Sequence, residues 1–246
     1  MAQNNAKDFL ESYNKLDYFM RKQLRRTTGY DSHSNLLREM AKRNHVVFQK
    51  NLQDLLLYAD LRNALVHNPF LEEVDPIAEP HDRIVEQYTK IVEAVMNPPK
   101  AVDTIAVLEA DIYKIEPKDR VVEVMQRMSR FAFTHAPIMR GGRIVGVFST
   151  DTIFDYLAND ISKGMITERM QIRDLIQYTK LECHANDYFR FMSVQANTTE
   201  VEEAFSHSPH PEKRTALVFL TDNGKASGTL IAMVTPWDIL SFLNSP

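Results

Sequence analysis

Two short stretches of this sequence combine residue types and spacings that could do chemistry. The first is Thr235-Pro236-Trp237-Asp238, which stands between a β-rich apolar run and an apolar helical run. Side chains at a strand-to-helix junction lie at a helix N-terminus, where free backbone amides and the helix dipole favour an anion such as a phosphate. The carboxylate of Asp238 could also accept hydrogen bonds from two donors at once. An anion-binding site is one interpretation of this segment.

The same four residues also have the pattern of a helix cap. Thr235 would be the N-cap, Pro236 would take the first helical position, and Asp238 the third, as in a capping box. A helix benefits from such a cap whether or not a ligand binds, so both interpretations stay open. We interpret Trp237 as a side chain that fills the core.

The second stretch is Asp60 to His67, at the end of a strongly apolar helical run. With 3.6 residues per turn, Asp60, Asn63 and His67 share a polar stripe. By residue type, His67 could move a proton near neutral pH, Arg62 could hold an anion, and Asn63 could orient either group. The stripe indicates a site, or else a polar pair satisfied at a helix end. The packed face beside the stripe is predicted to contain Leu57, Leu61, Ala64 and Leu65.

Charge and composition exclude several classes of protein. The 246 residues carry a net charge of −4, which excludes a uniformly basic nucleic-acid coat, although residues 21–50 hold eight basic and two acidic residues that could meet RNA. Only 7 glycines are present, without a GxGxxG or P-loop pattern, so dinucleotide-binding and P-loop folds are disfavoured. The single cysteine, Cys183, excludes an internal disulfide, and no metal site is predicted. Without an apolar signal or spanning run, we expect a cytoplasmic location and no membrane.

Residues 6 to 97 have the pattern of an amphipathic helical bundle. Three helices are predicted, with Ser32 or Ser34 as the cap of the second and a third helix from about Asp82 to Met96. The prolines that follow Asn97 disfavour helical geometry and mark a domain boundary. The first domain is therefore predicted to span residues 1–98.

From residue 101 the sequence alternates short strands with short helices, and the order β-α-β-β-α occurs twice. A fold of α+β class follows, with a helical bundle before the repeat pair. The first copy is placed at about residues 101–160 and the second at about 167–244, within a domain of residues 99–246. The predicted elements are strands at 112–115, 135–139, 143–149, 189–194, 215–221 and 229–235, and helices at 119–131, 152–158, 198–205 and 236–243.

The repeat resembles a tandem pair of CBS domains, modules that sense adenosine ligands. The resemblance is carried by His135-Ala136-Pro137-Ile138-Met139, a glycine turn and Gly146-Val147-Phe148-Ser149 in the first copy, and by Met233-Val234-Thr235 with Asp238 in the second. It implies binding of an adenine nucleotide (AMP, ADP or ATP) or a related adenosyl ligand. The implied ligand residues are Thr235, Asp238, Ser149, Ser193 and Ala196, with Arg140, Arg143, Lys213 and Arg214 as candidates for phosphate contacts. In the first copy Thr152 replaces the carboxylate, so we expect that site to be degenerate.

Arg62-Asn63-x-x-x-His67 is similar to the motif of HEPN domains, helical bundles that often dimerise and, in many members, cleave RNA. Three functions follow from the two resemblances. The first is a regulatory protein whose CBS pair binds an adenosyl ligand and signals to an HEPN-like domain. The second is a metal-independent HEPN ribonuclease gated by that pair, and the third is a scaffold for dimerisation without a ligand. A homodimer is expected in each case.

Overall fold

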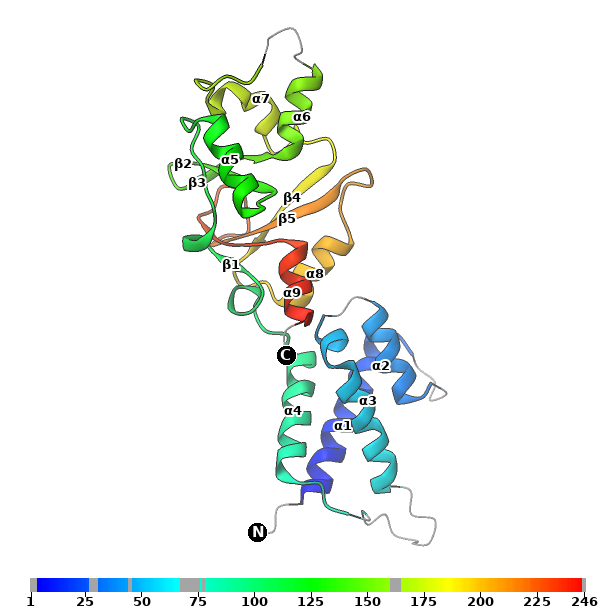
Figure 1. The fold of residues 1–246 in the computed structure, drawn as a ribbon. Helices are drawn as coiled ribbons and strands as arrows, with labels where there is room; N and C mark the ends of the chain where they lie inside the picture. The colour runs from blue at the N-terminus through cyan, green and yellow to red at the C-terminus, as the bar shows by residue number, and fades with distance from the viewer. Residues whose placement is uncertain are drawn as a thin grey trace. The chain divides into compact units, whose positions relative to one another are not determined.

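The computed structural model describes residues 4–26, 31–43, 46–66, 76, 78–159 and 165–244. The fold is of mixed α+β class, with helices first and alternating strands and helices after them, as the sequence predicts. The chain divides into two compact units, residues 1–99 together with 243–246, and residues 100–242. Each unit is described by itself (Figure 1). None of the described helices has the length and apolar character that crossing a membrane requires.

The helical unit contains four helices in its described part: α1 (Asn5–Gln23), α2 (His33–Lys42), α3 (Val46–Val66) and α4 (Asp82–Met96). The prediction of three helices is wrong, because the second predicted helix is divided into α2 and α3. These two helices pack against each other, which buries both apolar stripes, whereas a single straight helix would leave them in line. The apolar stripe continues from α2 into α3, so the periodicity of the sequence does not reveal the break between the two helices.

Side-chain caps mark helix starts that the sequence signals locally. Asn4 caps α1 by accepting from the amide of Lys7 at 2.9 Å. Ser32 caps α2 by accepting from the amide of Asn35 at 3.3 Å, so the cap is Ser32 and not Ser34. Helix α4 begins and ends at the predicted residues.

The predicted packed face of α3 is wrong in part. Leu65 is buried, as expected, but Leu57 is 65% exposed and Ala64 is also exposed. The buried face contains Leu55 and Ala59 instead. Residues 55–58 are all apolar, so the sequence does not select which of them faces the bundle.

The second unit contains the repeated β-α-β-β-α order. Its elements are β1 (Val107–Leu108), α5 (Val121–Phe131), β2 (His135–Arg140), β3 (Arg143–Ser149), α6 (Thr150–Asn159), α7 (Ile176–Thr179), β4 (Asp187–Ser193), α8 (Thr198–Ser206), β5 (Arg214–Thr221), β6 (Leu230–Val234) and α9 (Pro236–Asn244). The leading strand predicted at 112–115 is a single parallel bridge between Ile115 and Ile138. The strand β1, which was not predicted, precedes it.

Two sheets organise this unit. Strands β2 and β3 form an antiparallel pair, and the other sheet has the order β1-β6-β5-β4. Strands β4 and β5 are parallel because α8 crosses between them, and β5 and β6 form an antiparallel pair. Strand β1 pairs with β6, with Val107 opposite Met233. The second sheet is therefore completed by a strand from the start of the first copy.

The two copies share a core. Ile144 and Val147 of β3 pack in one cluster with Phe189 of β4 and Phe219 of β5. Gly146, also in β3, lies so close to α7 that an added Cβ would be 2.4 Å from the carbonyl oxygen of Thr179. Residues from both copies can therefore meet around one site.

Candidate functional site

The segment Thr235–Asp238 forms the corner between β6 and α9. The backbone N–H and the hydroxyl of Thr235 each donate to Oδ2 of Asp238 at 2.7 Å. The bond from the Thr235 amide and a second one from the Asp238 amide to the Thr235 hydroxyl oxygen, at 3.4 Å, are those of a capping box, so the structural role proposed for the pair is present. Both bonds to the carboxylate end on the same oxygen, and Oδ1 accepts no hydrogen bond from any described residue. Capping therefore leaves half of the carboxylate for another partner.

Thr235 and Asp238 line a cavity of about 210 Å³, which we call the corner cavity. Its wall also contains Trp237 from the second copy, and Tyr113, Phe133 and His135 from the first. The prediction that Trp237 fills the core is wrong, since its side chain is 69% exposed. In the first turn of α9 the side chain that packs inward is Ile239, which is 8% exposed.

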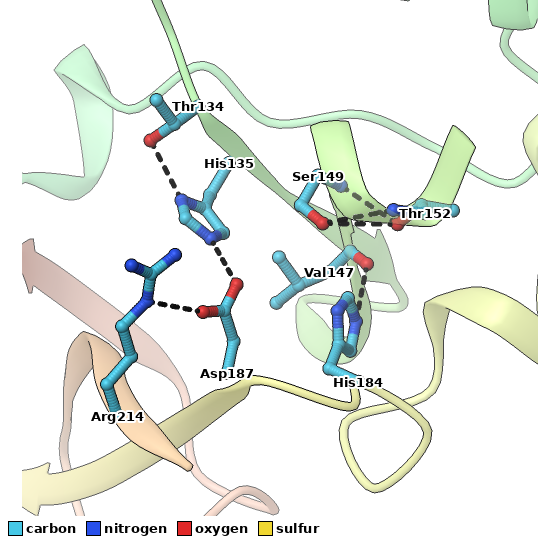
Figure 2. Close-up of polar contacts among 8 residues, drawn as sticks. All are labelled: Thr134, His135, Val147, Ser149, Thr152, His184, Asp187 and Arg214. Carbon is cyan, nitrogen blue, oxygen red and sulfur yellow. Dashed lines mark hydrogen bonds and ion pairs between the residues drawn. The ribbon is translucent and has the colours of Figure 1, made fainter. Parts of the chain in front are cut away.

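His135 connects the wall of the corner cavity to a buried carboxylate (Figure 2). Its Nε2 lies 3.0 Å from Oδ2 of Asp187, and Arg214 donates from Nε to Oδ1 of the same carboxylate at 3.2 Å. On the other side of the ring, Nδ1 lies 2.8 Å from the hydroxyl oxygen of Thr134. The Asp187 side chain is only 3% exposed. The bridge joins β2 of the first copy to β4 and β5 of the second.

The charge of Asp187 determines which ring nitrogen of His135 carries the proton when the ring is neutral. Burial alone would raise the pKa of Asp187, but the hydrogen bonds from His135 and Arg214 outweigh burial and lower the pKa below its usual value. The ionised carboxylate accepts the Nε2 proton, and in a neutral ring Nδ1 then accepts from the Thr134 hydroxyl. The carboxylate thereby fixes the tautomer and the orientation of the imidazole ring. The arrangement orients His135 and Thr134 at the cavity wall.

A second histidine, His184, is buried and makes structural contacts. It is 2% exposed, and its Nε2–H donates to the carbonyl of Val147 at 3.1 Å (Figure 2). Burial lowers the pKa of His184, so the neutral ring is favoured. Its ring meets the ring of Phe189 at 90°, with centroids 4.7 Å apart.

The corresponding corner of the first copy is closed. The Ser149 amide donates to the Thr152 hydroxyl at 3.0 Å, and the two hydroxyl oxygens are 3.3 Å apart (Figure 2). Ser149 is 1% exposed and Thr152 is 0% exposed. Ser149 borders a different cavity, of about 520 Å³, whose wall is formed by α5, residues 132–134, the end of β3 and the start of α6. The structure does not bring Ser149 together with Thr235 and Asp238.

Ser193 and Ala196 also lie apart from the corner cavity, whose described wall does not include them. The Ser193 hydroxyl accepts from the amide of Gln195 at 3.2 Å, and the carbonyl of Ala196 accepts from the amide of Ala101 at 2.9 Å. The four basic residues proposed as phosphate contacts are likewise not among the described wall residues. One of them, Arg214, binds Asp187 instead.

The residues of the proposed RNA-cleaving motif are described in part. Arg62 and Asn63 lie near the end of α3, and His67 lies outside the described residues. The guanidinium carbon of Arg62 is 5.5 Å from the centroid of the Tyr13 ring, which stacks on the ring of His33 at 3.9 Å. Asn63 is exposed. Arg62 is thus placed by an aromatic contact with α1.

Several arginines of the basic stretch at residues 21–50 are bound to carboxylates. Arg21 pairs with Asp17 at 2.6 Å, and Arg26 and Arg43 pair with Glu39 at 3.3 and 3.1 Å. Such pairs leave less positive charge for a phosphate backbone than the sequence count indicates.

Sequence interpretation missed Tyr113, Phe133 and His135 as wall residues. The sequence places His135 at the start of a strand and of the segment that carries the CBS resemblance but assigns it no role, and it does not single out the two aromatic residues. Phe133 carries no signal in the local sequence either, because the left-handed turn before it is formed by Ala132 (φ +56°) and not by a glycine or asparagine. The contact of His135 with Asp187 has no signal in the local sequence.

Comparisons with known proteins match one segment of the chain to a family model. Residues 102–159 match the family model of the CBS domain, which therefore corresponds to the first copy. No curated protein matches the chain. Similar solved structures include CbpB in complex with c-di-AMP (16% identity, 65% of this chain and 93% of that chain covered, TM-score 0.44) and CBSX2 in complex with AMP (14% identity, 58% and 94% covered, TM-score 0.41). Another is a CBS domain protein from Streptococcus pneumoniae TIGR4 (15% identity, 58% and 81% covered, TM-score 0.42).

Proposed function

We propose that this chain is a cytoplasmic regulatory protein whose CBS-type pair binds an adenine nucleotide or a related adenosyl ligand and signals to the HEPN-like helical domain. The proposal takes residues 1–98 and 99–246 as the two domains. One observation carries it: Thr235 and Asp238 line a cavity together with three aromatic side chains, Tyr113, Phe133 and Trp237. Aromatic faces suit a purine base, and a carboxylate suits a ribose.

In this proposal Asp238 recognises the ribose. Oδ2 is used by the cap, while Oδ1 has no partner among the described residues and can accept from a ribose hydroxyl. Trp237 is exposed beside it and offers a flat face to a base. In this proposal Thr235 and Asp238 contact the ligand directly. Ser149, Ser193 and Ala196 remain proposed ligand residues from the family resemblance, at positions apart from the corner cavity.

The experiment is a thermal-shift panel with AMP, ADP and ATP on the full chain and on the Asp238→Asn variant. A ligand at about 100 times its Kd adds about 2.7 kcal/mol to the free energy of unfolding, which raises the Tm measurably. In Asp238→Asn the side chain keeps an oxygen that can cap α9 but loses the carboxylate. We expect a folded protein with a smaller shift or no shift.

A matched control is Glu200→Gln, because Glu200 caps α8 through its contact with the amide of Asn197 at 2.8 Å and is not a wall residue of the corner cavity. This variant should keep the ligand-induced shift. If no adenosyl compound raises the Tm at millimolar concentration, the sensor proposal fails, and the ligandless scaffold remains.

RNA cleavage by the helical domain is the second candidate function. The observation that favours it is the environment of Arg62: its Nε is buried without a hydrogen-bond partner, and no described carboxylate pairs with its side chain. An unpaired guanidinium can bind phosphate. In this proposal His67 transfers the proton, and Arg62 and Asn63 bind and orient the substrate.

The test of this second candidate is cleavage of single-stranded RNA in the presence of a chelator. We expect His67→Ala to lower the rate by about 10²- to 10⁴-fold, because a proton-transferring group is lost. Cleavage that persists in this variant, or that needs a divalent ion, contradicts the proposed site.

A homodimer is the proposed assembly. The 520 Å³ cavity between α5 and α6 is largely apolar, and Phe154 and Leu157 of α6 are 72% and 46% exposed. Exposed apolar surface of this kind is typical of an interface. Light scattering should find a dimer for the native chain and a monomer for Phe154→Asp. Asn159→Asp adds the same charge to the same helix and should leave the dimer intact.

A further inference from the structure

A second cavity adjoins the corner cavity. It has a volume of about 330 Å³ and shares Asp111, Ile112, Tyr113 and Phe133 with the corner cavity. We call it the flank cavity. Its remaining wall is formed largely by α5 and the residues that follow β1. The two cavities therefore share part of their walls, including Tyr113 and Phe133.

The corner cavity alone is small for the proposed ligand. Its volume of 210 Å³ lies below the lower end of the range for small-molecule sites, roughly 300 Å³. Joined to the flank cavity, the site falls within that range. An adenosine compound with a long 5′ substituent would extend from one cavity into the other.

The charges of the two cavities differ. Asp111 and Asp238 are carboxylates of the corner cavity, and its described wall contains no lysine or arginine. A phosphate chain is disfavoured beside these carboxylates. The flank cavity has two basic residues in its wall, Lys114 and Arg127, with Asp111 as an opposing charge at the junction.

Of the two basic residues, Arg127 is the one that can bind phosphate. Lys114 is bound to the carboxylate of Glu109 and also donates to the Glu109 carbonyl at 2.8 Å. Arg127 is exposed, and none of the described carboxylates pairs with it. Its guanidinium carbon lies 4.8 Å from the centroid of the Tyr113 ring, a contact that holds the side chain over the wall.

The junction between the cavities is a stack of rings. Tyr113 and Phe133 have centroids 5.6 Å apart and planes inclined by 21°. Arg127 lies against the Tyr113 side of this stack. A guanidinium oriented in this way has less freedom to lose when it binds a phosphate through two N–H groups.

We propose that the two cavities form one bipartite site that selects an adenosine polyphosphate, with the adenosine in the corner cavity and the outer phosphates on Arg127 in the flank cavity. The inference rests on the proposed function and specifies its ligand class. Asp238 recognises the ribose, and Arg127 recognises the length of the phosphate chain.

The test is titration calorimetry with adenosine, AMP, ADP and ATP on the native chain and on Arg127→Leu. A charge-assisted contact to the outer phosphates should make ATP bind roughly 10- to 100-fold more tightly than AMP. Arg127→Leu should remove most of this gain and leave the affinity for adenosine unchanged. Arg130→Leu is the control, because Arg130 belongs to the same helix and lies 5.5 Å from the Phe131 ring but is not a wall residue of either cavity.

Equal affinities of AMP and ATP for the native chain overturn the inference and leave the adenosyl sensor in place. The inference is also overturned if Arg127→Leu weakens the binding of adenosine and of ATP equally, because Arg127 would then act through its packing on Tyr113. If none of the four compounds binds, the proposed function itself fails. Arg127→Gln, which retains a polar side chain of similar length, provides a second variant should Arg127→Leu fold poorly, and circular dichroism checks both.

Discussion

The two strand-to-helix corners of the repeat have the same capping geometry and different surroundings. In the first copy Ser149 and Thr152 bond to each other and are almost fully buried. In the second copy Thr235 and Asp238 make the equivalent contacts but stay partly exposed, at the wall of the corner cavity. One position, Thr152 against Asp238, accounts for the difference in charge.

The comparison teaches how a duplicated element can divide its roles. Two hydroxyls satisfy each other without charge, so the first corner can be buried at little cost. A carboxylate has more acceptor capacity than the cap uses and is costly to bury without partners, so the second corner stays open. The same backbone gives a structural corner once and a candidate ligand corner once.

A second difference lies three residues before each hydroxyl. Gly146 occupies this position in the first copy, where the carbonyl oxygen of Thr179 leaves no room for a Cβ. Ala232 occupies it in the second copy and is fully buried. The first corner is therefore covered more closely by the chain that follows it.

The largest expected effect is the loss of stability in the variant Gly146→Ala. A Cβ placed 2.4 Å from the backbone oxygen of Thr179 forces β3 and α7 apart, and we expect the free energy of unfolding to fall by about 3 kcal/mol in urea denaturation. The reciprocal variant Ala232→Gly should lose only about 1 kcal/mol through backbone entropy. Equal losses would mean that the two corners are covered alike.

The next effect concerns the bridge between the copies. Asp187→Ala removes the partner of both His135 and Arg214, and we expect a loss of about 2 kcal/mol of unfolding free energy. Arg214→Ala should lose less than about 1 kcal/mol, because that side chain is 76% exposed. If denaturation gives similar losses for the two variants, His135 contributes little to the bridge.

The two caps can be compared directly with isosteric variants. Thr152→Val leaves the buried amide of Ser149 without its acceptor, and we expect a loss of about 1.5 kcal/mol, against about 0.5 kcal/mol for Thr235→Val at the open corner. Only Thr235→Val should weaken adenosine binding in calorimetry. A ligand effect from Thr152→Val would show that the first corner is not closed.

The smallest effect is a pH dependence from His184. Its folded pKa is lowered by burial, so on acidification the unfolded state takes up the proton first, and stability is lost as the pH falls below the unfolded pKa of about 6.5. The native chain should therefore lose more unfolding free energy between pH 7.5 and 5.5 than His184→Gln does. The lowered carboxyl pKa of Asp187 acts only below its unfolded value of 3.8, outside this interval. Parallel curves for the two proteins would contradict this account of His184.

Local signals allowed most elements to be predicted. The bounds of β3 and α4 agree with the expected residues because each is set by nearby turn or proline residues. Thr235 and Asp238 were found as candidates for the same reason, since a cap pattern spans only four residues. Interactions between residues that are close in the chain can therefore be predicted from the sequence.

The features that could not be predicted depend on distant contacts. Pairing of β1 with β6 and the bond from His135 to Asp187 bring together segments that no periodicity relates. The exposure of Trp237 depends on which side of α9 meets the sheet, and an apolar residue in an amphipathic helix does not specify this. The wall of the corner cavity is built by such contacts.

The position of β1 has a consequence for how the second unit folds. Because β1 lies at the start of the first copy and pairs with β6 of the second, the sheet is complete only after nearly the whole unit has been synthesised. Pairing of this kind has a high contact order and slows folding. A fragment that begins after β1 would present the β6 edge to other molecules and be prone to aggregation. The second copy is therefore a poor choice for excision as an independent module.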